Sequence, residues 1–285
     1  RVLRVTMNKS RVPAMTHPAV IDELMTLVDP GKVLTDPASL EAYGKDWTKH
    51  YAPAPSAIVL PKTTEQVQAI VAWANKHKVA LVPSGGRTGL SAGAVAANGE
   101  VVVAFDYMNQ ILAFNEFDRT VVCQPGVVTR QLQQFAEDNG LYYPVDFASS
   151  GSSQIGGNIG TNAGGIKVIR YGMTRNWVAG LKVVTGKGEL LELNKDLIKH
   201  ATGYDLRQLF IGAEGTLGFV VEATMRLDRA PRNLTAMVLG TPDFDSIMPV
   251  LHAFQGRLDL TAFEFFSDKA LAKVMGRGDV PPPFD

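Results

Sequence analysis

The sequence predicts an α+β fold for this chain of 285 residues, and three observations carry the prediction. Segments of strand character outnumber helical segments as far as residue 230. Residues 56–82 show the succession strand, helix, strand of a β-α-β unit. Residues 179–185 and 189–194 flank a Gly-Lys-Gly turn, which is typical of a β-hairpin. Because several strands would pair with sequence neighbours, a regular doubly wound sheet is disfavoured.

Two helices of the main domain are predicted from their periodicity. Within residues 63–78, apolar residues recur at i, i+3, i+4 and i+7 from Val67 onward and so share one stripe. Thr63 and Gln66 match the capping-box pattern at the start of this helix. Residues 128–139 again place apolar residues on one face, and a glycine directly follows as a stop signal.

The strands of the main domain are predicted as short runs rich in β-branched residues. In addition to the hairpin, they are 56–61, 79–83, 100–106, 120–126, 141–145 and 219–227.

Beyond residue 230 the pattern restarts as a new β-α-β succession. We expect strands at 233–241 and 259–267 around a helix at 243–256, and then a short helix at 268–278. The predicted parts of the chain are a leader and helical segment at 1–51, the main domain at 52–230, and the incomplete beginning of a second α+β domain at 231–285.

Composition argues against several classes of protein. Lys+Arg and Asp+Glu number 28 each, and a net charge of zero argues against a nucleic-acid partner. A single cysteine, Cys123, excludes an internal disulfide framework, and its place in an apolar strand predicts a buried hydrophobe. No apolar run approaches the ~20 residues that cross a bilayer, so a cytoplasmic protein is expected. The five histidines show no metal-ligand spacing, so no metal site is predicted.

Two glycine-rich segments are the most informative local features. Residues 83–93 hold four glycines, and residues 151–165 hold six among Ser, Thr and Asn. Glycine lets backbone N–H groups approach phosphate oxygens closely, so two such segments favour a large phosphate-bearing ligand over ordinary turns. The Rossmann pattern G-x-G-x-x-G and the P-loop pattern are both absent from the sequence, which argues against those two nucleotide sites.

Residues 89–93 also satisfy G-x-S-x-G, the nucleophile elbow of α/β-hydrolases. That elbow needs a strand immediately before the serine and a helix immediately after it. Here the preceding strand ends near Pro83, and the following residues start a helix poorly. We therefore predict that Ser91 is a loop residue and not a nucleophile.

Taken in order, the segments PSGGRTGLSAG, CQPGV, PVDFASSGSSQIGGNIGTNAGG, RYG, GLKVVTGKGE and GYDLRQLFIGAEGTLGFVVEATMRL resemble FAD-linked oxidases of the vanillyl-alcohol oxidase/PCMH type. Within that family the chain is most similar to the D-2-hydroxyacid dehydrogenase branch, which acts on D-2-hydroxyglutarate or D-lactate and includes the FAD subunit of glycolate oxidase. The resemblance runs from about Ala52 to Leu227. It implies that the main domain is an FAD-binding domain of two subdomains, followed by the start of a substrate or cap domain.

The resemblance also implies which residues contact the cofactor. They are Pro83, Ser84, Gly85, Gly86, Arg87, Thr88, Gly89, Leu90 and Ser91 at the pyrophosphate; Pro125 and Gly126; Asp146, Ser149, Ser152, Ser153, Gly156, Gly157, Asn158, Thr161, Asn162, Gly164 and Gly165 beside the flavin and ribityl chain; and Glu214, Gly218 and Val220 at the adenosine end. Arg87 has two interpretations, a charge-assisted contact to phosphate or an outward, solvated side chain.

The implied activity is hydride transfer from a D-2-hydroxy acid, with D-2-hydroxyglutarate favoured, to a non-covalently held FAD. Electrons would pass to an acceptor such as an electron-transfer flavoprotein or a quinone, and a homodimer is one candidate assembly. The alternative is an FAD-binding subunit without catalysis of its own. The motifs identify no catalytic residue, and a divalent metal is expected only in a C-terminal part that this chain lacks, so we expect the chain alone to be incompetent.

Overall fold

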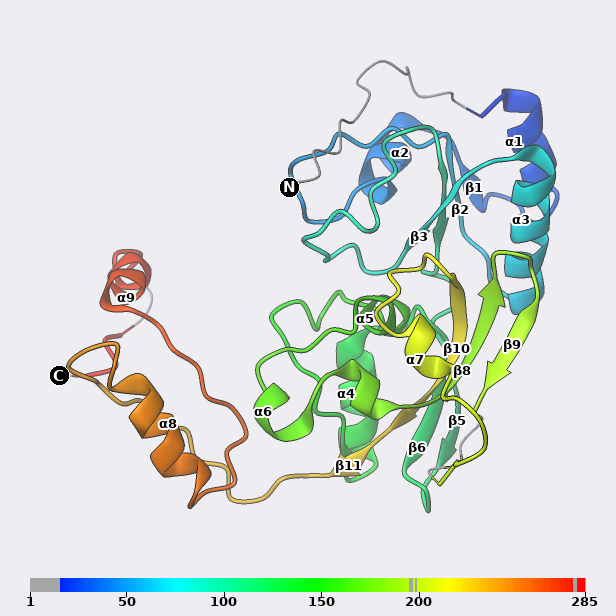
Figure 1. The fold of residues 1–285 in the computed structure, drawn as a ribbon. Helices are drawn as coiled ribbons and strands as arrows, with labels where there is room; N and C mark the ends of the chain where they lie inside the picture. Colours follow the sequence, from blue (N-terminus) through cyan, green and yellow to red (C-terminus); the bar gives the residue numbers. More distant parts are fainter. Residues whose placement is uncertain (1–15, 195–196, 198, 279–280, 285) are drawn as a thin grey trace, which may run out of the picture.

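The structure, a computed structural model, describes residues 16–194, 197, 199–278 and 281–284. Residues 1–15 of the predicted leader and helical segment therefore lie outside the described residues. The described residues form two main sheets that are offset from one another, with helices against both, and a small two-stranded sheet; the predicted α+β class is confirmed. Figure 1 shows the first sheet at the top of the view and the second sheet below it. No helix among the described residues is long and apolar enough to cross a membrane.

The first sheet has the strand order β1-β2-β4-β3. Its strands are β1 (Val33–Leu34), β2 (Ala57–Val59), β3 (Leu81–Ser84) and β4 (Val101–Ala104). The last three strands run parallel, and β1 is antiparallel to β2. Helix α3 (Thr64–His77) connects β2 to β3, so the predicted β-α-β unit is confirmed.

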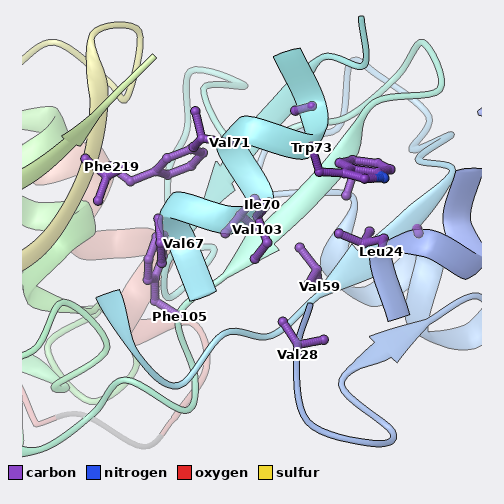
Figure 2. Packing of buried hydrophobic residues seen from close by; sticks show 14 of the residues in the cluster. Leu24, Val28, Val59, Val67, Ile70, Val71, Trp73, Val103, Phe105 and Phe219 are labelled. Atoms are coloured by element: carbon purple, nitrogen blue, oxygen red, sulfur yellow. The ribbon is translucent and has the colours of Figure 1, made fainter. Parts of the chain in front are cut away.

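The predicted stripe of α3 faces the core. Figure 2 shows Val67, Ile70 and Val71 of α3 among the labelled residues of the cluster that packs against the first sheet. One of the two hydrogen bonds of the predicted capping box is present: the Thr63 side chain accepts from the Gln66 N–H. In the other direction, Gln66 Oε1 accepts from the Lys62 N–H and not from that of Thr63. The helix therefore starts at the predicted residue with half of a capping box.

The segment before residue 52 is part of the same packing. Helix α1 (Pro18–Met25) buries Leu24 in the α3 cluster, and β1 hydrogen-bonds with β2. Helix α2 (Pro37–Tyr43) follows β1 and leads toward the glycine-rich loop after β3. Residues 16–51 thus pack on the first sheet.

The second sheet is antiparallel, with the order β5-β6-β10-β8-β9. Its strands are β5 (Ile111–Asn115), β6 (Thr120–Cys123), β8 (Val178–Thr185), β9 (Leu190–Leu193) and β10 (Gly218–Arg226). The predicted hairpin is confirmed in β8 and β9. Strand β5 was not predicted; it lies at the edge of the sheet, is partly exposed along its length and pairs with β6 in an irregular register.

Two helices cover the second sheet, α4 (Thr129–Asp138) and α5 (Ile155–Thr161). Leu132 and Ile155 are fully buried in the cluster between these helices and the sheet. Cys123 belongs to this cluster, and burial raises the pKa of its thiol to about 12, so the prediction of a buried hydrophobe is confirmed.

Shorter elements complete the main body of the fold. They are β7 (Leu141–Tyr142), which pairs with β11 (Asp228–Arg229), α6 (Val168–Tyr171), the 3-10 helix η1 (Thr174–Trp177) and α7 (Arg207–Phe210).

After residue 230 the helices are confirmed and the strands are not. Helices α8 (Ile247–Gln255) and α9 (Asp268–Met275) lie where they were predicted, and Figure 1 shows them apart from the two sheets. Residues 233–241 and 259–267 form no strand, because no described segment pairs with either of them. A helix satisfies its own backbone, whereas a strand needs a second segment, and this difference explains the error.

Candidate functional site

A cavity of about 920 Å³ lies where the two glycine-rich segments meet. Most of the predicted cofactor contacts are in its wall. Those residues are Pro83, Ser84, Gly85, Gly86, Arg87, Thr88, Gly89, Leu90, Ser91, Pro125, Ser149, Ser152, Ser153, Gly156, Gly157, Asn158, Thr161, Gly164, Gly165, Glu214, Gly218 and Val220. The fold thus gathers residues more than 130 positions apart around one space.

Three predicted contacts lie outside this wall, each for a visible reason. Gly126 packs where a Cβ would lie 2.1 Å from the carbonyl oxygen of Phe105. The Asp146 carboxylate pairs with a lysine, and Asn162 Oδ1 accepts from the Arg175 N–H at 3.0 Å. These three residues thus contact other parts of the protein, and their contact with the cofactor stays a prediction.

The loop after β3 offers a row of unpaired backbone donors. The N–H groups of residues 85–91 donate no hydrogen bond to any other described residue, although the whole loop lines the cavity. The loop is half-buried to exposed, so these N–H groups are open to a ligand, and consecutive free N–H groups are the donors that anion sites in loops commonly use. The loop therefore suits a phosphate group without help from a cationic side chain.

Of the two interpretations of Arg87, the outward, solvated side chain does not fit the structure, and the contact with phosphate stays a prediction. The residue has φ = 58°, and its guanidinium donates to the Gly85 carbonyl at 2.9 Å and to the Asp106 carboxylate at 3.2 and 3.3 Å. The ring of Tyr43 lies 4.4 Å from the guanidinium. Arg87 is thus turned back into the protein, where it fixes the curvature of the loop.

The two glycine-rich segments touch at Gly86. A Cβ on Gly86 would lie 2.1 Å from the Ser152 carbonyl oxygen and 2.7 Å from Ser153 Cα. Real Cβ atoms do not approach backbone this closely, so only glycine allows the two loops to meet.

Helix α5 was not predicted, because three of its seven residues are glycine. Tertiary contacts hold it instead. The Asn158 side chain donates to Thr129 Oγ1 at 2.7 Å, and Thr129 Oγ1 lies 2.7 Å from Ser153 Oγ, all three residues being buried. This polar network fixes the second glycine-rich segment to α4.

The wall also holds polar atoms without partners. Ser84 Oγ and Gln154 Oε1 are buried and make no hydrogen bond with the described residues, although both residues line the cavity. Gly157 lines it as well, and a Cβ there would meet no atom within 4 Å. Unpaired polar groups and an open backbone are what a polar ligand of the size of a dinucleotide requires.

Other chemistries find no support in the described residues. Strand β3 ends at Ser84, and no helix follows residues 89–93, so the local structure confirms that Ser91 sits in a loop and not in a nucleophile elbow. No group of three or more His, Cys, Asp or Glu side chains that could hold a metal ion occurs in the described part of the chain.

Sequence reasoning missed several wall residues. Asp46 and Trp47 come from the segment before the predicted domain, so no motif indicated them. The others lie beside predicted contacts; they are Gly93, Ala94, Phe105, Phe147, Ala148, Gln154, Gly160, Ala163, Phe210, Ala213, Gly215 and Phe219. For these the glycine-rich segments were the signal, since most of them lie within or next to a predicted stretch.

Asp146 joins two walls of the cavity from behind. Lys167 Nζ lies 2.8 Å from the Asp146 carboxylate, and the Asp146 carbonyl oxygen accepts from the Ile166 N–H at 3.1 Å. Partial burial acts to raise the pKa of Asp146, but the hydrogen bond and charge of Lys167 outweigh it, and the pKa is lowered. Residues 147–149 and 163–165, on either side of this link, line the cavity.

Replacing Lys167 with Met is expected to lower the free energy of unfolding by about 1–2 kcal/mol at neutral pH, because it leaves the partly buried Asp146 carboxylate without its cationic partner. The folded-state pKa of Asp146 is lowered, so the pair stabilises above the unfolded pKa and loses this effect as the pH falls through the folded value. Urea unfolding should therefore show a smaller difference at about pH 3 than at neutral pH. Lys45→Met, which breaks an exposed pair with Glu41, is the control. A difference that does not change with pH would contradict the assignment.

Comparison with known proteins agrees with this geometry. Residues 55–194 match a family model described as FAD binding domain. The chain is 88% identical over 271 residues to a D-2-hydroxyglutarate dehydrogenase of Stutzerimonas stutzeri (strain A1501), a match that covers 95% of this chain and 58% of that protein. It is 56% identical over 268 residues to a D-2-hydroxyglutarate dehydrogenase of Xanthomonas citri pv. viticola, covering 94% of this chain and 57% of that protein.

A solved structure of p-cresol methylhydroxylase with substrate bound superposes with a TM-score of 0.72 at 21% identity, over 85% of this chain and 50% of that chain. This likeness concerns the fold, which is that of PCMH-type flavoproteins. The chain spans about half the length of the curated relatives it matches. Residues 55–194 belong to the FAD binding domain family, which confirms the resemblance to FAD-linked oxidases that the motifs carry.

Proposed function

We propose that the cavity between the glycine-rich segments is the FAD site. The observation that carries this proposal is the row of unpaired N–H groups at residues 85–91, because the pyrophosphate of FAD is a doubly charged anion. Residues 149–165 would run beside the flavin and ribityl chain, and residues 214–220 beside the adenosine end. Ser84 Oγ and Gln154 Oε1 would then gain the partners that they lack in the protein alone.

The test is reconstitution. The apo chain should take up one FAD, and NAD should not compete, because the cavity lacks the fingerprint of a Rossmann site. Flavin fluorescence and equilibrium dialysis measure the binding directly. A chain that binds NAD but not FAD would overturn the proposal.

We expect the FAD to be held without a covalent bond. None of the described residues that line the cavity is His, Cys or Tyr, so the wall offers no usual point of attachment. The one cysteine is buried in the cluster between the second sheet and helices α4 and α5, and its raised pKa of about 12 keeps the thiol protonated. Acid precipitation of the holoprotein should therefore release the yellow colour into the supernatant. A yellow pellet would contradict this prediction.

For the whole protein we propose oxidation of a D-2-hydroxy acid, with D-2-hydroxyglutarate favoured, to the 2-oxo acid. The high identity to curated D-2-hydroxyglutarate dehydrogenases supports this assignment. The bound flavin would supply the hydride-accepting chemistry, and the chain's own residues would bind and orient it. An electron-transfer flavoprotein or a quinone is the proposed acceptor, a homodimer is the proposed assembly, and the single cysteine favours a cytoplasmic location.

Anaerobic flavin bleaching tests the activity. The FAD-loaded whole protein is mixed in turn with D-2-hydroxyglutarate, D-lactate, D-malate and glycolate, and D-2-hydroxyglutarate should bleach the flavin fastest. Retention of flavin without bleaching by any of the four would favour the alternative, an FAD-binding subunit that depends on a partner.

A further inference from the structure

A segment outside the family-matched region holds the far end of the phosphate loop. Residues 43–47 precede the match, which begins at residue 55. The Trp47 N–H donates to the Gly89 carbonyl at 2.9 Å, and the Ala96 N–H donates to the Gly44 carbonyl at 2.9 Å. With the Tyr43 ring against the guanidinium of Arg87, three ties connect this segment to the loop and to the residues just after it.

Two neighbouring side chains of this segment, both in the cavity wall, differ strongly in burial. Asp46 is buried, with Oδ2 3.3 Å from the position that a Cβ on Gly89 would occupy, and Oδ1 accepts from the Thr48 N–H at 2.9 Å. The next residue, Trp47, also lines the cavity, yet 69% of its surface is exposed. A buried neighbour and a fixed backbone thus hold a large aromatic ring in the open at the cavity wall.

The position of Trp47 points to one half of the ligand. Gly89 belongs to the loop proposed for the pyrophosphate, and Glu214, at the proposed adenosine end, lies beside the same loop, with Oε2 3.0 Å from the Cβ position of Gly93. Trp47 is thus hydrogen-bonded through its backbone to the loop proposed for the pyrophosphate, which belongs to the ADP half of FAD.

We propose that Trp47 is a ligand-contacting residue whose indole packs on the ADP half of the bound dinucleotide. The inference rests on the proposed FAD site and deepens it. An indole ring offers a wide apolar face that stacks on a purine with little loss of side-chain entropy, and such stacking commonly changes affinity by an order of magnitude. Binding would cover a ring that the protein alone leaves in water.

The Trp47→Leu variant tests which half of the ligand Trp47 contacts. Its dissociation constants for FAD and for ADP should rise about tenfold, whereas the dissociation constant for riboflavin, which lacks the ADP half, should stay unchanged. Phe117→Leu is the matched control, because Phe117 is an aromatic residue, 96% exposed, that does not line the cavity. Thermal unfolding of both apo variants should stay close to wild type, since both side chains are mainly exposed.

Tryptophan emission of the unmutated protein gives a second measurement. ADP should quench the emission, and Trp47→Leu should remove this quenching, because Trp73 and Trp177 do not line the cavity. If Trp47→Leu binds FAD and ADP as wild type does and the quenching persists, this inference is overturned while the FAD site stands. If wild type binds neither FAD nor ADP, the proposed function fails and the inference fails with it.

Discussion

Gly86→Ala is expected to abolish FAD binding, with a loss of affinity of at least about 100-fold, and to lower the free energy of unfolding by about 1–3 kcal/mol. The added methyl would lie 2.1 Å from the Ser152 carbonyl oxygen and 2.7 Å from Ser153 Cα, which are backbone atoms that no rotamer change can move. The two glycine-rich segments must then separate. Because each contributes one wall of the cavity, both the wall and the row of free N–H groups would be displaced.

Flavin titration and urea unfolding of the apo protein measure the two effects separately. Gly151→Ala is the matched control, because Gly151 lies in the second glycine-rich segment, away from the cavity wall, and a Cβ there would meet no atom within 4 Å. Wild-type affinity for FAD in Gly86→Ala would mean that the contact between the two segments does not shape the site.

The cofactor loops could be located from the sequence because glycine serves the fold and the ligand at the same positions. Gly86 is required where the loops touch, and Gly157 leaves space in the wall. Both requirements produce the same signal in the sequence, a high density of glycine, and this signal locates the cavity. The roles of charged neighbours could not be predicted in this way. Arg87 and Asp146 stand in the right segments, yet each is neutralised by a partner from another element, Asp106 and Lys167.

Other errors have the same origin in contacts between distant residues. Helix α5 has poor intrinsic propensity, and its first two N–H groups donate instead to Val127 and Pro125 in a neighbouring segment, which no local pattern contains. Trp47 was assigned outside the domain because the segment that carries it has no motif. The strands at 233–241 and 259–267 were inferred from apolar runs alone, and an apolar run does not specify a pairing partner.

Gly157→Leu is expected to separate folding from cofactor binding. The glycine lies in helix α5 and lines the cavity, and a Cβ there would meet no protein atom within 4 Å. The apo protein should therefore fold as well as wild type, or gain up to about 0.8 kcal/mol of stability, since leucine is a better helix former than glycine. Affinity for FAD should fall at least about 100-fold, because the leucine side chain would occupy space that the ligand needs.

The control places the same side chain in open space elsewhere. Gly186, in the turn between β8 and β9, also has no atom within 4 Å of its Cβ position and does not line the cavity, so Gly186→Leu should keep wild-type affinity for FAD. Thermal unfolding of both apo proteins verifies that they are folded before flavin titration. If Gly157→Leu bound FAD normally while folded, the dinucleotide would have to lie elsewhere than in the space beside α5. We expect Gly157→Leu to lose FAD binding while staying stable, whereas Gly86→Ala should lose both binding and stability. This difference would show that Gly86 lets the two walls meet and that Gly157 leaves room for the ligand between them.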